Sequence, residues 1–138
     1  MRETNRVLVI GLDGATWDVL EPWIADGSLS NLGRLRQLGS WGVLQSTVPP
    51  ISAAAWSSFM TGKGPGKHGV FHFLQSLDVD QESQEEPRLV NATSIRSPTI
   101  WDVLGHQDLE LASINVPMTY PPRPVNGIMI TGLLTPKN

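Results

Sequence analysis

A serine at the start of a short predicted helix is the residue of this chain whose position best suits chemistry. The segment 48–62 reads Val-Pro-Pro-Ile-Ser-Ala-Ala-Ala-Trp-Ser-Ser-Phe-Met-Thr-Gly. Two prolines hold the chain extended before the helix-forming residues 53–60, and Gly62 stops the helix, so Ser52 is predicted at its N-cap. Unpaired backbone N–H groups and the helix dipole at that point favour a phosphate or another anion. A serine that only caps a short buried helix explains the same pattern.

An aspartate that directly follows an apolar run is the second candidate. Residues 7–12 read Val-Leu-Val-Ile-Gly-Leu, which predicts a central parallel strand covered on both faces. Asp13 follows its carboxyl end, where the functional crevice of an open α/β sheet lies, and is therefore placed to hold a metal ion or a ligand. The pair Asp13-Gly14 is also a common turn, and the residues alone leave both interpretations open.

The glycine-rich segment 62–69 supplies two further candidates, Lys67 and His68. It reads Gly-Lys-Gly-Pro-Gly-Lys-His-Gly and predicts a flexible loop. The segment differs from a P-loop, because Thr61 stands where the first glycine is needed and His68 stands where Ser or Thr must follow the lysine. Both side chains are candidates to line a substrate site, although a histidine in such a turn is more often structural.

The elements that must position these residues indicate an α/β fold with a mostly parallel sheet flanked by helices. Helical spacing of apolar residues predicts helices over residues 16–25 and 30–38 and a third that opens at Ser97-Pro98, and short apolar runs predict strands over residues 41–47, 109–114 and 128–131. The polar segment 75–95 is expected to be an exposed excursion. We expect one domain over residues 1–138, with the strand 41–47 bringing Ser52 to the sheet edge where Asp13 emerges.

Composition narrows the class of partner. The 138 residues are 40% hydrophobic, carry a net charge of −3 and contain no Lys/Arg run, so a nucleic-acid polymer is not expected as partner. The absence of cysteine excludes disulfide and thiolate chemistry. The apolar run near the N-terminus is too short for a signal peptide or a membrane span, so we expect a cytoplasmic protein with no membrane partner.

Several segments occur here in one order and together resemble a known family. They are the strand ending in Gly-Leu-Asp13-Gly-Ala-Thr-Trp-Asp, the segment 46–62 around Ser52, the loop 64–69, and the later segments Asn115-Val-Pro-Met-Thr-Tyr-Pro-Pro and Gly132-Leu-Leu-Thr-Pro. This set resembles the type I phosphodiesterase/nucleotide pyrophosphatase branch of the alkaline phosphatase superfamily over nearly all of the chain.

The resemblance implies a metal-dependent phosphoric ester hydrolase with an alkaline-phosphatase-like core. Asp13 matches the aspartate that binds one of two divalent metal ions, usually zinc, and Ser52 matches the nucleophile, which also binds metal. The implied reaction is in-line attack of Ser52 on phosphorus, formation of a phosphoserine, and hydrolysis by a metal-bound water. The backbone amide of Ala53, at the helix tip, is expected to stabilise the phosphoryl oxygens. The expected substrate is a small phosphate ester.

Two departures from the family pattern limit what the resemblance implies. Ala55 stands where nucleotide-cleaving relatives have an asparagine that holds a phosphate oxygen, so the substrate class stays open. Asp13 and Ser52 also fall short of the roughly three protein ligands that each metal ion needs. We expect the remaining ligands to follow Asn138, so the chain is interpreted as an incomplete N-terminal portion with weak zinc binding and negligible activity of its own.

Other classes of protein explain parts of the pattern. A haloacid-dehalogenase-type phosphatase needs an aspartate where this chain has Gly11, and a sulfatase or phosphoglycerate mutase has a different signature around the nucleophile. A non-catalytic anion-binding domain, or a pseudoenzyme of the same fold, remains the alternative from a different class. A portion of a larger sheet exposes strand edges, so we also expect self-association, with a homodimer as the simplest form.

Overall fold

The computed structural model describes residues 6–75 and 88–136. The chain divides into two compact units, residues 1–45 and residues 46–138, named unit 1 and unit 2 below. The single domain expected over residues 1–138 stays a prediction.

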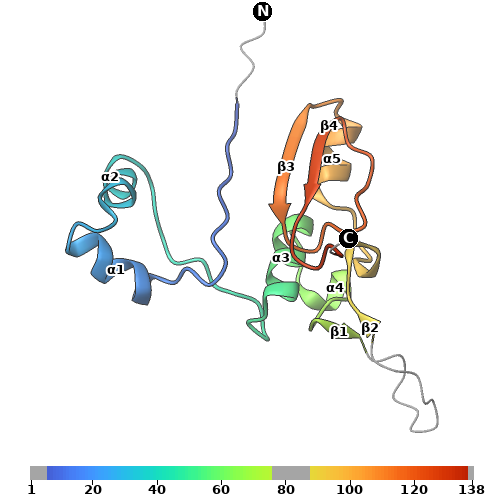
Figure 1. The fold of residues 1–138 in the computed structure, drawn as a ribbon, viewed down its shortest axis with the longest axis horizontal. Coiled ribbons are helices and arrows are strands. Elements are labelled where there is room, and N and C mark those ends of the chain that lie inside the picture. The colour runs from blue at the N-terminus through green and yellow to red at the C-terminus, as the bar shows by residue number, and fades with distance from the viewer. Residues whose placement is uncertain (1–5, 76–87, 137–138) are drawn as a thin grey trace, which may run out of the picture. The chain divides into compact units, whose positions relative to one another are not determined.

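Unit 1 is built from two short helices, α1 (Trp17–Ala25) and α2 (Ser30–Leu38) (Figure 1). Both helices confirm the sequence prediction almost to the residue. Thr16 is the N-cap of α1, and its Oγ1 atom accepts a hydrogen bond from the Asp18 backbone N–H at 3.3 Å. The backbone N–H of Gly39 donates to the Leu35 carbonyl and closes the end of α2.

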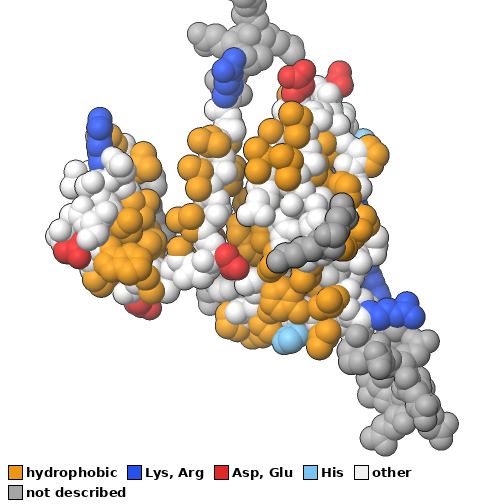
Figure 2. Space-filling view, in the orientation of Figure 1, with side chains coloured by type: hydrophobic (Ala, Val, Ile, Leu, Met, Phe, Trp, Pro, Cys, Tyr) orange, Lys and Arg blue, Asp and Glu red, His pale blue; other side chains and the backbone are white. Residues whose placement is uncertain are grey.

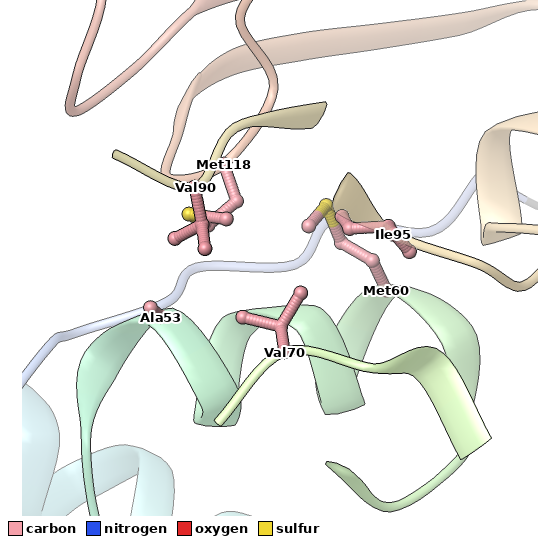
Figure 3. Close-up of a cluster of buried hydrophobic side chains, with 6 residues drawn as sticks. All are labelled: Ala53, Met60, Val70, Val90, Ile95 and Met118. Atoms are coloured by element: carbon pink, nitrogen blue, oxygen red, sulfur yellow. The ribbon is translucent and has the colours of Figure 1, made fainter. Parts of the chain in front are cut away.

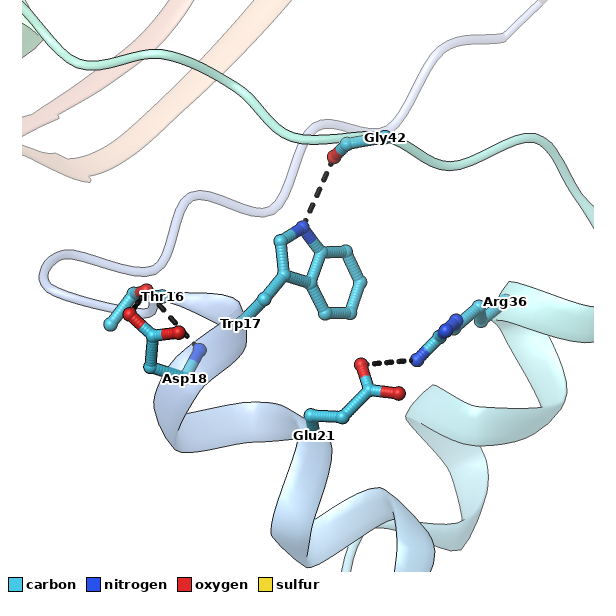
Figure 4. A network of polar contacts seen from close by, with 6 residues as sticks. All are labelled: Thr16, Trp17, Asp18, Glu21, Arg36 and Gly42. Carbon is cyan, nitrogen blue, oxygen red and sulfur yellow. Dashed lines mark hydrogen bonds and ion pairs between the residues drawn. The ribbon is translucent and has the colours of Figure 1, made fainter.

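The Arg36 guanidinium packs against two indole rings and connects these helices to the segment that follows them. Figure 4 shows Arg36 and Trp17 with their polar partners. The Arg36 guanidinium lies 3.8 Å from the ring centroid of Trp41 and 5.3 Å from that of Trp17. It also pairs with the Glu21 carboxylate at 2.6 Å, so α1 and α2 are joined through one side chain. The Trp17 indole N–H donates to the Gly42 carbonyl at 3.1 Å. An ion pair, cation–π contacts, an edge-to-face contact of the two indoles and a hydrogen bond therefore hold the described part of unit 1 together, in which no residue is buried.

The two strands predicted before the Ser52 helix are wrong. Residues 7–12 and 41–47 have no strand structure, and the first of these segments is exposed: Val7, Leu8 and Ile10 have 84%, 84% and 74% of their surface accessible. A strand is stable only when its backbone groups pair with a neighbour and one face is covered. No strand pairs with either segment in the part of the chain that the structure describes. Figure 2 shows the hydrophobic side chains along this N-terminal segment.

Unit 2 contains the remaining elements. In chain order these are α3 (Ser52–Thr61), α4 (Pro65–His68), β1 (Leu74–Gln75), β2 (Arg88–Leu89), the 3₁₀ helix η1 (Ala92–Ser94), α5 (Ile100–His106), β3 (Leu111–Val116) and β4 (Gly127–Thr131). The helix predicted to open at Ser97-Pro98 begins instead after Thr99, because Thr99 and Asp102 cap it reciprocally.

A small parallel sheet confirms the α/β class. β3 and β4 pair in parallel, with Ala112 opposite Ile128 and Ile114 opposite Ile130. They correspond to the strands predicted over residues 109–114 and 128–131. β1 and β2 form a separate antiparallel pair.

The core of unit 2 lies between α3 and the segments that follow it (Figure 3). Six buried side chains form it: Ala53, Met60, Val70, Val90, Ile95 and Met118. Ala53 and Met60 come from the same face of α3, and Met118 comes from the turn after β3. The position of the helix that carries Ser52 is therefore fixed by the packing of these core side chains and not by the β3–β4 sheet alone.

The structure describes the two ends of the polar segment 75–95, which was predicted to be exposed. Residues 76–87 lie outside the described residues, and the flanks form the β1–β2 pair and η1. Val90, Ala92 and Ile95 are buried, so the second flank belongs to the core. No helix among the described residues has the length and apolar character needed to cross a membrane.

Candidate functional site

Ser52 is the first residue of α3 and not its N-cap. Ile51 is the N-cap, with φ −114° and ψ 136°, and its carbonyl accepts the first helical hydrogen bond from the Ala55 N–H at 2.9 Å. The predicted N-cap position was wrong by one residue, because the chain turns helical directly after Ile51. Gly62 ends the helix in the left-handed region with φ 64°, as predicted. Ser52 is half-buried at the helix tip.

The first turn of α3 is rigidly held. Ala53 and Ala54 are fully buried, and Ala53 packs in the core cluster with Val90 and Met118. The first backbone N–H groups of an α-helix have no acceptor within the helix. Ser52 is therefore the partly accessible residue of this turn, whereas Ala53 and Ala54 face the core. The binding of an anionic group at the helix tip stays a prediction.

The turn after β3 lies against this helix and connects two further segments singled out in the sequence. Met118 adopts φ 65° and is buried beside α3. The Thr119 hydroxyl donates to the Val116 carbonyl at 2.6 Å, and its oxygen accepts from the Gly132 backbone N–H at 3.2 Å. The segments beginning at Asn115 and at Gly132 are therefore joined at the carboxyl ends of β3 and β4.

Asp13 lies in a turn of unit 1. The Asp13-Gly14 pair forms the turn that its composition allows, with Gly14 at φ 70°, and the Asp13 side chain is exposed. The strand that was expected to deliver Asp13 does not form. Asp13 belongs to unit 1 and Ser52 to unit 2, so their convergence on one site stays a prediction.

The glycine-rich segment is a short helix rather than the predicted flexible loop. α4 places Lys67 on the surface and buries His68 completely. The backbone carbonyls of both residues accept hydrogen bonds from residues 96–97. The Ser97 hydroxyl donates to the Lys67 carbonyl at 3.2 Å, and the Arg96 backbone N–H donates to the His68 carbonyl at 2.9 Å.

His68 is bonded through both ring nitrogens. Its Nδ1 atom accepts from the Val70 backbone N–H at 3.2 Å, and its Nε2 atom lies 2.9 Å from the Ser58 Oγ atom. The first contact assigns the proton of the neutral ring to Nε2, so His68 donates to Ser58. Burial lowers the pKa of His68, which favours this neutral form.

The Ser58–His68 pair was missed by sequence reasoning. A nucleophile–base pair would need an unprotonated Nε2 facing the serine, and here Nε2 carries the proton. The pair therefore holds α4 against α3. Ser58 and His68 are ten residues apart, and only the stop at Gly62 followed by the turn of α4 indicates that they can meet. The predicted substrate contacts of Lys67 and His68 stay predictions.

Among the described residues, no group of three or more His, Asp or Glu side chains is placed to hold a metal ion. Carboxylate and hydroxyl oxygens can each bind a divalent cation, but Asp13 and Ser52 alone fall short of a complete set of about three ligands per ion. The described donor set therefore does not fit a dinuclear centre by itself.

Comparison with known proteins identifies the family of this chain. Neither the curated proteins nor the solved structures give a significant match. A family model described as "Type I phosphodiesterase / nucleotide pyrophosphatase" matches residues 7–136. That span includes the α3 tip, α4 and the turn after β3, and it covers nearly the whole sequence. The chain therefore belongs to the type I phosphodiesterase/nucleotide pyrophosphatase family of hydrolases.

Proposed function

We propose that unit 2 supplies the nucleophile of a metal-dependent phosphoric ester hydrolase, and that Ser52 is this nucleophile. The observation that carries the proposal is the position of Ser52 as the first residue of α3, in a chain whose family hydrolyses phosphodiester and pyrophosphate bonds. The alkaline-phosphatase-like core expected from the sequence is part of the same proposal.

The proposed reaction begins with attack of the Ser52 Oγ atom on phosphorus. The Oγ–P bond forms while the bond from phosphorus to the leaving oxygen breaks, and the hydroxyl proton ends on the leaving alcohol. Water then hydrolyses the phosphoserine and restores the hydroxyl. The backbone N–H of Ala53 stays the proposed donor to the phosphoryl oxygens, because first-turn amides lack helical acceptors. Ala53 is fully buried in the structure, so the proposal requires that its N–H becomes accessible when substrate binds.

Metal ions are expected in the reaction because of the family to which the chain belongs. The family generally depends on metal, and zinc remains the ion proposed from the sequence. Asp13 and Ser52 do not complete a site, and the described residues supply no further cluster. We infer that the remaining ligands come from polypeptide outside the described residues, and that the 138-residue chain alone has negligible phosphodiesterase activity.

The test compares the longest polypeptide that the gene encodes with its Ser52→Ala variant. Zinc-dependent hydrolysis of bis(4-nitrophenyl) phosphate should fall by about 10³-fold or more in Ser52→Ala, since removal of a catalytic nucleophile has effects of this size. Ser58→Ala is the matched control, because Ser58 lies in the same helix and bonds His68 instead. Activity of Ser52→Ala within about tenfold of the parent would contradict the assignment.

The alternative function is a non-catalytic anion-binding domain of the same fold. It is favoured by the same helix tip, which can hold an anion without any chemistry. The same polypeptide, assayed for phosphate binding and for hydrolysis, distinguishes the two functions. Phosphate binding without metal, together with no hydrolysis in the presence of zinc, supports the binding domain.

A further inference from the structure

Backbone strain gathers at the carboxyl ends of β3 and β4. Four non-glycine residues of the described chain have a positive φ, and three of them lie in this region: Asn115 at 57°, Met118 at 65° and Leu134 at 77°. Such conformations are uncommon for residues with a Cβ atom, and they persist where the surrounding contacts impose them. The contacts that impose the strain therefore indicate what this region does for the rest of unit 2.

The Thr119 side chain is the polar link that holds the turn after β3. Thr119 is 3% exposed, and its hydroxyl donates to the Val116 carbonyl at 2.6 Å and accepts from the Gly132 N–H at 3.2 Å. A Cβ atom at Gly132 would lie 2.5 Å from the Val116 carbonyl oxygen, so this close approach of the two backbones requires glycine. One hydroxyl therefore joins the ends of both strands.

A second attachment fixes the other side of the same turn. The Tyr120 carbonyl accepts from the backbone N–H of Ala92 at 2.8 Å, and Ala92 is a buried residue of η1. Both attachments, at Thr119 and at Tyr120, lie within two residues of Met118. Met118 is 2% exposed and belongs to the core cluster of unit 2. The turn therefore holds the Met118 side chain in one position in the core.

The core cluster connects this turn to both neighbours of Ser52. Ala53 belongs to the cluster together with Met118, and Ile51 packs against the cluster. Figure 3 shows Met118 beside Val90, with Ala53 at the start of α3. Ser52 lies between Ile51 and Ala53 and is itself half-buried. Because protein cores are close-packed, a displacement of Met118 would disturb the packing that fixes the first turn of α3.

We propose that Thr119 is a positioning residue for Ser52. Its hydroxyl fixes the turn that holds Met118 in the core, and the core packing of Met118 holds the α3 tip in the geometry that attack on phosphorus requires. Thr119 acts through these contacts and not through the substrate. The inference rests on the proposed role of Ser52 as nucleophile. It gives a role to the segments beginning at Asn115 and at Gly132, which the proposed reaction does not use directly.

Two substitutions of Thr119 test the proposal in the polypeptide used for the Ser52→Ala comparison. Thr119→Val removes the hydroxyl and keeps a similar shape, whereas Thr119→Ser keeps both hydrogen bonds. Thr119→Val should lower kcat for bis(4-nitrophenyl) phosphate by about tenfold or more at little-changed KM, because misplacement of a reacting group by about 1 Å costs on the order of 10²-fold. Thr119→Ser should restore kcat to near that of the parent.

A measurement without substrate or metal tests the positioning independently of activity. The backbone amide signals of Ser52 and Ala53, recorded by NMR, should shift in Thr119→Val and return in Thr119→Ser. Met118→Ala keeps the Thr119 hydroxyl and shortens the side chain that packs in the core. It should lower kcat and shift the same amide signals, and it provides the test if Thr119→Val does not fold.

Thr99→Val is the matched control, because Thr99 is also 3% exposed and its hydroxyl donates to the Asp102 carboxylate at 2.8 Å in the cap of α5. It should lower stability without changing kcat or the Ala53 amide signal. All kinetics are compared below the thermal transition of every variant, which excludes unfolding as a cause.

The positioning role is overturned if Thr119→Val leaves kcat or the Ala53 signal unchanged, if Thr119→Ser fails to restore them, or if Thr99→Val causes an equal loss of kcat. Activity that persists in Ser52→Ala contradicts the proposed function instead. In that case the Ala53 signal still shows whether the Thr119 hydroxyl holds the α3 tip, so the two failures are distinguishable.

Discussion

The Nε2 atom of His68 lies 2.9 Å from the Oγ atom of Ser58, and the proton between them belongs to His68. The Val70 N–H at the other ring nitrogen enforces this assignment. A fully buried histidine with both nitrogens engaged can be neutral without cost, whereas a second ring proton would face the Val70 N–H directly. His68 therefore connects the stability of unit 2 to pH.

The first prediction is that unit 2 loses stability as the pH falls below about 6.5, the usual pKa of histidine in an unfolded chain. Burial lowers the pKa of His68 in the folded state, so the unfolded state binds the proton first. The contribution is fully present above pH 6.5 and declines as the pH falls toward the lower folded pKa. Urea unfolding at a series of pH values between about 5 and 7.5 measures it.

The pH dependence should shrink in His68→Asn, even if that variant is less stable at every pH. The matched control is His72→Asn, which replaces an exposed histidine of the same unit and should keep the slope of the parent. A slope that persists in His68→Asn would assign the effect to another group.

Local signals in the sequence predicted the helices well. Gly62 is the stop that the sequence indicates, because the end of a helix depends on a few neighbouring residues. β3 and β4 were also predicted, since each combines a short apolar run with an adjacent partner. The residues 7–12 show the limit: their composition favours a strand, but a strand needs a partner that composition does not specify.

The candidate site was predictable only in part. The position of Ser52 at the α3 tip follows from local pattern to within one residue. The burial of His68 and its bond to Ser58 both depend on where separate segments of the chain pack against each other. Hydrophobic periodicity and secondary-structure propensity carry no information on such tertiary contacts, which are determined by packing.

The second prediction concerns Gly69, the residue that ends α4. Gly69 has φ +81°, and an added Cβ would crowd the Arg96 stem. Gly69→Ala should therefore destabilise the chain by about 1–2 kcal/mol. Gly66→Ala is the matched control, because Gly66 lies inside α4, an added Cβ atom would meet nothing within 4 Å, and the variant should gain stability. Equal thermal shifts of the two variants would contradict the prediction.

The third prediction concerns Asp102, which caps α5. Burial acts to raise the pKa of Asp102, but hydrogen bonds from the Thr99 N–H and hydroxyl, with the charges of Arg123 and His106, outweigh it and lower the pKa. Asp102→Asn should cost about 1–2 kcal/mol at pH 7, mostly from the cap, because the partly exposed Arg123 pair at 3.6 Å is screened by solvent. Urea unfolding measures the loss, and Glu110→Gln, an exposed change of equal charge, should leave stability within about 0.5 kcal/mol.

The last prediction concerns the parallel sheet of unit 2. Ile114 and Ile130 are register partners on one face of the β3–β4 sheet, and they are 65% and 55% exposed. Within the described residues, β3 and β4 pair only with each other, so each keeps an outer edge with unpaired backbone groups. We expect the chain to self-associate through this sheet, with a dimer as the simplest form, and Ile130→Lys to shift sedimentation velocity profiles toward monomer. Val103→Lys introduces the same charge at a 55% exposed position of α5 and should leave association unchanged. A parent chain that sediments as a monomer at high concentration would refute self-association through the β3–β4 sheet. An equal effect of both variants would show that the association depends on net charge instead.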